Sequence, residues 1–142
     1  MAKQKKEDQV VELYNLVAKA HDRLKKVHAK HLGSEKLTTP QFGVLDVLMK
    51  KGSIPLKKIS DELMVTGANI TCVMDNLEKE DLVRRVHSKS DRRVINAELT
   101  AKGKNKLEKI YPQHVRSLND FSKKLSDTEL KQLSNLLDKL AS

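Results

Sequence analysis

The stretch VTGANITCVMDNLEKEDLVRRVHSKSDRRVINAELTAKGKNKL, residues 65–107, decides the fold that the sequence predicts. In its first part, apolar residues recur at three- and four-residue steps, which predicts a helix over about 67–80 with a stripe of Ile70, Val73, Met74 and Leu77. The pattern then changes to two short strands, 82–86 and 94–99, joined by a polar and charged loop. Thr100 is placed to cap the helix that follows the second strand.

The residues just before this stretch complete a helix-turn-helix. A short helix is predicted over about 56–63, and Thr66 is placed to cap the next helix after a tight turn. An earlier helix begins after a Thr38 cap, with proline in its first turn, and ends at Gly52. The central part of the chain is therefore predicted to be a helix, a helix-turn-helix and a two-stranded wing.

Amphipathic helices flank this central part. The first spans about 7–32, after a lysine-rich start that is expected to be a disordered tail. Another helix spans about 101–123, and Pro112 inside it is expected to cause a kink. Ser126 and Glu129 form a capping box before a last helix whose apolar stripe is Leu130, Leu133, Leu137 and Leu140.

The predicted fold class is mainly α with a small β wing. Residues 37–100 form the winged helix-turn-helix unit, residues 1–36 an N-terminal helix of a dimerisation region, and residues 101–142 the C-terminal dimerisation helices. The apolar stripes of the terminal helices are longer than a unit of this size needs to bury. A second copy of the chain is expected to cover them, so the sequence predicts a homodimer.

The composition narrows the class of partner. The 142 residues include 28 Lys and Arg against 19 Asp and Glu, and the net charge of +9 favours a polyanion such as nucleic acid. Two tyrosines, two phenylalanines and no tryptophan are too few for stacking on single strands or exposed RNA bases. One cysteine excludes an intrachain disulfide, and no apolar run is long enough to span a membrane. A soluble, cytoplasmic protein without a membrane partner is expected.

Residues 65–107 resemble the MarR family of bacterial transcription regulators. The shared features lie in the wing, at the end of the second strand and in the next helix: Asp91-Arg92-Arg93, Leu99-Thr100 and Lys102-Gly103. The flanking helices match as well. The resemblance implies a winged helix-turn-helix homodimer that binds a pseudo-palindromic operator in double-stranded DNA. It also implies a repressor released by a small-molecule effector, commonly an anionic aromatic compound, while the sequence leaves repression or activation open.

The side chains expected to contact DNA lie on the second helix of the helix-turn-helix and in the wing. Those on the helix are small or polar enough to enter a major groove: Thr66, Gly67, Ala68, Asn69, Thr71, Cys72 and Asn76. Those in the wing are Lys89, Arg92 and Arg93. Arg92 is assigned to the minor groove, with Arg93 and Asp91 bracing the turn as an ion pair. The opposite assignment of the two arginines stays open.

Two positions depart from the family pattern. Cys72 stands where many relatives carry arginine, so a bidentate guanine contact is lost. Its thiol is either a small group chosen for fit or a redox switch. Met64 stands where relatives often place glycine, which predicts strain in the turn.

The resemblance also implies an effector pocket lined by the first, second and fifth helices. The candidates are Tyr14, His21, Phe42 and Tyr111, with plain core packing as the alternative. Gln41 and Phe42 occupy the positions at which zinc-sensing relatives carry Glu and His, so no metal site is expected.

Two other classes of function compete with a sequence-specific regulator. A basic dimer can also coat DNA without sequence preference or act as an architectural protein, and charge alone does not separate these roles. An enzyme is not expected, because the sequence has no Gly-rich phosphate loop, no HExxH motif and no cysteine cluster. Cys72 also has no histidine close by in sequence, and no cofactor is expected.

Overall fold

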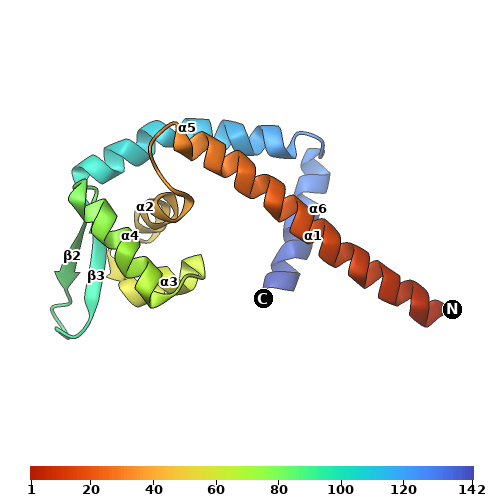
Figure 1. Cartoon of the computed structure of the whole chain (residues 1–142), viewed down its shortest axis with the longest axis horizontal. Helices are drawn as coiled ribbons and strands as arrows, with labels where there is room; N and C mark the ends of the chain where they lie inside the picture. The colour runs from red at the N-terminus through yellow and green to blue at the C-terminus, as the bar shows by residue number, and fades with distance from the viewer. The chain divides into compact units, whose positions relative to one another are not determined.

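The computed structural model describes all 142 residues and confirms a mainly helical fold with a small antiparallel sheet (Figure 1). The elements, in chain order, are α1 (Ala2–Gly33), α2 (Thr39–Lys51), β1 (Ile54–Pro55), α3 (Leu56–Leu63), α4 (Gly67–Lys79), β2 (Val83–His87), β3 (Ile95–Leu99), α5 (Ala101–Ser122) and α6 (Asp127–Ala141). The chain forms two compact units. One is Leu32–Pro112, and the other combines Met1–His31 with Gln113–Ser142.

The Leu32–Pro112 unit has one hydrophobic core. Each of its elements contributes apolar side chains that periodicity places on one face, among them Leu45 of α2, Ile59 of α3 and Met74 of α4, all fully buried. The first half of α5 adds Leu107 and Ile110. This core fixes the helix-turn-helix, α3 and α4, against the sheet.

The sheet has three strands in the order β1-β3-β2. β2 and β3 pair antiparallel from Val83 opposite Leu99 to His87 opposite Ile95, which confirms the predicted hairpin. The sequence did not predict the third strand: β1 pairs with the other edge of β3, with Ile54 opposite Ala97. Two residues are too few for a periodic signal, and tertiary pairing creates this strand.

The predicted helix starts are confirmed by hydrogen bonds. The Thr38 and Ser126 hydroxyls each accept from the third helical N–H in full capping boxes. The Thr66 hydroxyl accepts from Asn69 N–H at 3.1 Å, and the Thr100 hydroxyl from Gly103 N–H at 3.0 Å. These local bonds set where α2, α4, α5 and α6 begin.

In the unit of Met1–His31 and Gln113–Ser142, α1 begins at Ala2, so the expected disordered tail is wrong. The first residues are good helix formers without a glycine or proline, and they extend a helix that is already nucleated. α5 continues through Pro112 as one helix. No residue of α6 is buried, and its leucine side chains are exposed to solvent: Leu130, Leu133, Leu136, Leu137 and Leu140.

Candidate nucleic-acid interface

Helix α4 presents three distinct faces. Ile70, Val73, Met74 and Leu77 form the first face and are buried in the core of the Leu32–Pro112 unit. The predicted stripe is confirmed, and it fixes which side of α4 can meet another molecule. The other two faces follow from the helical repeat of 3.6 residues.

The second face, here called the recognition face, consists of Ala68, Asn69, Cys72, Asn76 and Lys79. All five are exposed, and only Lys79, in the last turn, is charged. The Asn76 amide lies 4.0 Å from the Cys72 sulfur, and Cys72 is a free, exposed thiol. Amides, a thiol and a methyl group suit contact with base edges rather than with phosphates.

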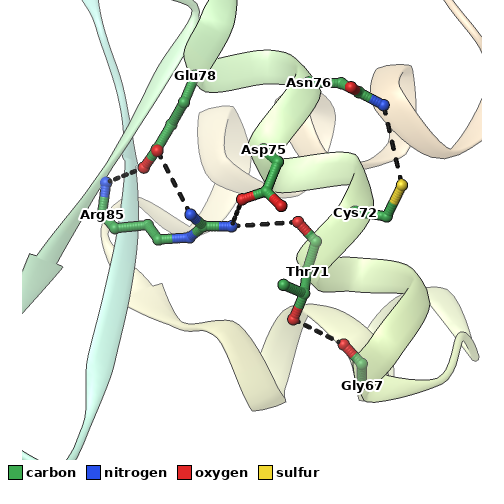
Figure 2. A network of polar contacts seen from close by, with 7 residues as sticks. All are labelled: Gly67, Thr71, Cys72, Asp75, Asn76, Glu78 and Arg85. Atoms are coloured by element: carbon green, nitrogen blue, oxygen red, sulfur yellow. Dashed lines mark hydrogen bonds and ion pairs between the residues drawn. The ribbon is translucent and has the colours of Figure 1, made fainter.

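The third face, here called the clamp face, consists of Thr71, Asp75 and Glu78 and meets Arg85 of β2 (Figure 2). The Thr71 hydroxyl donates to the Gly67 carbonyl at 3.0 Å, so it is held within the helix. Of the predicted helix contacts, Ala68, Asn69, Cys72 and Asn76 therefore share one face, Thr71 lies on another, and Thr66 and Gly67 form the helix start.

The wing holds five basic residues, and the structure pairs three of them. Arg84 Nε lies 2.6 Å from Glu98 Oε1 across the strand pair. Arg85 is bound to the clamp face, and Arg93 pairs with Asp91. Lys89 and Arg92 are exposed and make no ion pair. Of the five basic residues, these two are the ones that no carboxylate neutralises.

The predicted ion pair between Asp91 and Arg93 is present. Arg93 Nε and Nη2 lie 3.1 Å from the two Asp91 carboxylate oxygens, and the Arg93 backbone N–H donates to Oδ1 at 3.0 Å. The Arg93 side chain, and then its backbone N–H, hold the pKa of Asp91 below its usual value. Arg93 thus braces the turn.

His87 is a residue that the sequence interpretation missed. Its Nδ1–H donates to the Arg92 carbonyl at 2.9 Å and so ties the end of β2 to the far side of the wing loop. A hollow of about 710 Å³ beside it is lined by His87, Ser88, Lys89 and Arg92. The only sequence signal was the position of His87 at the strand end, directly before the basic loop.

A second basic groove joins α3 to the wing. It has a volume of about 660 Å³, and Lys57, Lys58 and Arg93 supply its positive charge. Apolar groups from Pro55, Leu56, Val94 and Ile95 form much of its wall, and Asp61 also lines it. Basic groups therefore extend from the wing to the start of the helix-turn-helix.

The predicted effector residues belong to both units of the chain. Tyr111 lines an apolar pocket of about 420 Å³ with Met49, Leu107, Glu108 and Pro112. Phe42 is 3% exposed and belongs to the core of the same unit. Tyr14 and His21 are exposed on α1, in the other unit.

The structure shows neither a cluster of metal-binding side chains nor a helix that could span a membrane. No group of three or more His, Cys, Asp or Glu side chains is arranged to hold a metal ion. No helix is both long enough and apolar enough to cross a membrane. The Gln41 side chain, at one position compared with zinc sensors, accepts from Thr38 N–H at 2.9 Å in the α2 capping box.

The helix-turn-helix of α3 and α4, followed by the β2-β3 hairpin, defines a winged helix-turn-helix DNA-binding protein. Residues 37–95 match the model of the MarR family. The chain is 31% identical to the HTH-type transcriptional regulator MhqR of Bacillus subtilis over 130 residues, which cover 92% of this chain and 90% of MhqR. The chain therefore belongs to the MarR family and is a DNA-binding transcriptional regulator rather than an enzyme.

Solved structures agree on the fold. The chain superposes with a TM-score of 0.85 on a cysteine-to-serine mutant of MarR from E. coli complexed with operator DNA, at 21% identity over 94% of this chain and 96% of that one. It superposes with a TM-score of 0.84 on BpsR of Bordetella bronchiseptica, whose DNA binding is regulated by 6-hydroxynicotinic acid. That match has 24% identity and covers 92% of this chain and 99% of BpsR.

Proposed function

We propose that this protein is a homodimeric repressor in the bacterial cytoplasm that binds a pseudo-palindromic operator and is released by a small-molecule effector. This proposal depends on one observation: the Leu32–Pro112 unit carries two different surfaces that suit two different parts of a DNA duplex. An almost uncharged recognition face on α4 lies in the same unit as a wing with two unpaired cations, Lys89 and Arg92. A protein bound to an operator can repress by blocking the promoter, and it needs no contact with another protein to do so.

The recognition face supplies sequence preference in this proposal. Asn69 and Asn76 can each form paired hydrogen bonds with adenine, and the Ala68 methyl group suits the methyl group of thymine. Cys72 lies between the two amides in the chain, and the only charge on this face is that of Lys79, in the last turn. Thr66 and Gly67, at the positive end of α4, are placed to meet a phosphate.

The wing supplies position and a minor-groove contact. Arg92 enters the minor groove, Lys89 meets phosphates, and Arg93 supports the turn while its outer edge faces solvent. The basic groove at Lys57 and Lys58 gives a further place for the phosphate backbone.

The competing function is DNA coating without sequence preference. Such a protein depends on many phosphate contacts, and a charged helix would serve it better than the recognition face does. The structure favours the sequence-specific function because the face of α4 left open by the core and by Arg85 is lined mainly by uncharged groups that suit base edges.

Selection from a random duplex library, at near-physiological salt, tests the proposal. We expect recovery of an inverted repeat whose half-sites lie about one helical turn apart. Retained DNA without a consensus would establish the coating function instead. Absence of retained DNA from the reduced, ligand-free protein would contradict both.

A second copy covers the open leucines of α6 in this proposal. Leu136 is 58% exposed and Leu140 is 62% exposed, and α1 adds Val10, Val11 and Leu16 to the exposed apolar surface. Apolar surface of this extent is unusual on a helix that stays in water. Two copies also match the twofold symmetry of an inverted repeat.

The pocket around Tyr111 is the place we propose for an effector. Its wall of Met49, Leu107 and Pro112 suits a small aromatic ring, and Tyr111 and Glu108 offer polar groups. Titration calorimetry with aromatic acids and their neutral amides tests this assignment. Binding that is lost in Tyr111→Ala supports the pocket, and binding that is unchanged in that variant excludes it.

A further inference from the structure

Arg85 binds the recognition helix at several points instead of pointing to solvent. Its Nη2 lies 2.6 Å from Asp75 Oδ1 and 3.1 Å from the Thr71 carbonyl oxygen, and its Nη1 lies 3.4 Å from Glu78 Oε2. Its backbone N–H also donates to Glu78 Oε1 at 3.0 Å. Figure 2 shows the guanidinium extending from β2 across α4 to all three clamp-face residues.

The Arg85 side chain is more buried than that of its neighbour in the chain, Arg84. The Arg85 side chain is 26% exposed, whereas the Arg84 side chain, one residue earlier, is 64% exposed. Arg84 forms its ion pair with Glu98, on the neighbouring strand of the wing, rather than with a residue of α4. The two arginines carry the same charge but serve different parts of the unit.

The contacts of Arg85 constrain the rotation of α4 about its own axis. Thr71, Asp75 and Glu78 lie four and three residues apart, so they share one face over two turns of the helix. The planar guanidinium holds acceptors on successive turns at once, which an ammonium group cannot do with the same geometry. The recognition face lies on the same helix. The contacts of Arg85 therefore also constrain the direction in which that face points.

We propose that Arg85 is a positioning residue for operator recognition: it joins the wing to α4 and aims Asn69, Cys72 and Asn76 at the base edges. This inference rests on the proposed sequence-specific function. It assigns Arg85 no contact with DNA. It also explains why two carboxylates, Asp75 and Glu78, are tolerated on a helix that approaches a polyanion, since Arg85 offsets their charge.

Quantitative DNA binding by Arg85→Ala, with Arg84→Ala as the matched control, tests the role. Both variants lose one wing arginine, and each is measured on the selected operator and on a scrambled duplex over a range of salt. For Arg85→Ala we expect operator affinity to fall by about tenfold or more, with a much smaller change on scrambled DNA and an unchanged salt slope. Arg84→Ala should keep the operator preference of the wild type.

The outcomes separate positioning from other roles. Equal losses on both duplexes, with a salt slope lower by about one, would show that Arg85 neutralises a phosphate and would overturn the inference. An unchanged operator preference in folded Arg85→Ala would also overturn the inference, because Arg85 would then have a role in stability only. Arg85→Lys keeps the charge but not the planar fork, so we expect it to recover only part of the preference.

Asp75→Asn keeps the inference testable even if Arg85→Ala does not fold. It removes a negative charge near DNA, so plain electrostatics predicts tighter binding to every duplex. Positioning by Arg85 predicts a lower preference for the operator instead, and uniform tightening would contradict the inference. A wild-type protein without any operator preference would contradict the proposed function itself, which distinguishes the two failures.

Discussion

Gly103 of α5 packs directly against the Leu82 carbonyl group. A Cβ atom added at Gly103 would lie 2.0 Å from the Leu82 oxygen, and the same oxygen accepts a hydrogen bond from Thr100 N–H at 3.1 Å. The obstacle is backbone directly before β2, so it cannot move aside as a flexible side chain would. The glycine therefore allows the start of α5 to lie against the wing.

Gly103→Ala should destabilise the protein by about 3 kcal/mol, since it forces overpacking against fixed backbone. Urea denaturation followed by circular dichroism measures this change. Gly33→Ala is the matched control, because nothing lies within 4 Å of a Cβ at that position. Equal stability of the two variants would contradict the close approach of α5 and Leu82.

Arg92→Ala should weaken operator binding by about tenfold and lower the salt slope by about one, with little change in stability. Arg93→Ala should weaken binding less, because the Arg93 guanidinium is already committed to Asp91. Fluorescence anisotropy with a labelled operator compares the two. A larger loss in Arg93→Ala would reverse the assignment of the wing arginines.

Deleting residues 126–142 should convert the dimer into a monomer or an aggregate, because it removes the leucine face of α6. The paired substitution Leu133→Asp and Leu137→Asp should give the same result in a chain of full length. Light scattering measures the mass of each variant. A stable dimer of both would show that the interface lies elsewhere.

Met64→Gly should stabilise the protein by about 0.5–1 kcal/mol, because Met64 has φ 53° and ψ 44°, in the left-handed region that favours glycine. Its side chain is 91% exposed. The substitution should therefore relieve the predicted strain in the helix-turn-helix and remove few side-chain contacts. Met64→Ala, which keeps the unfavourable backbone conformation, should show no such gain in thermal unfolding.

The capping box of α6 should contribute less stability in acid. The Ser126 backbone N–H, and then its hydroxyl, lower the pKa of Glu129 below the usual glutamate value. A carboxyl group whose pKa is lower in the folded state stabilises above its unfolded pKa, and this stability is lost as the pH falls through the folded pKa. The advantage of wild type over Glu129→Gln should therefore shrink between about pH 6 and pH 3. A constant difference would contradict this linkage.

The parts of the fold that the sequence predicted depend on short-range interactions. Thr38, Thr66 and Ser126 cap helices through bonds to residues three positions later, so their roles follow from local pattern. The ion pair of Asp91 and Arg93 spans two residues and was predicted for the same reason.

What the sequence did not predict depends on residues that meet only in the folded chain. Arg85 contacts Thr71, fourteen positions earlier, and Arg84 contacts Glu98, fourteen positions later. Composition places both arginines in a basic wing, and only the contacts made in the folded chain show that both are ion-paired with carboxylates. The two-residue strand β1 was missed because its existence depends on β3.

The separation of the three faces of α4 has an evolutionary consequence. The core face and the clamp face hold the helix in place, whereas Asn69, Cys72 and Asn76 are exposed and carry little of the folding energy. Under the proposed function, substitutions at these three positions would change the preferred target while stability and the attraction to phosphates persist. Duplicated copies of such a gene can acquire separate regulons by altering a few side chains on one scaffold.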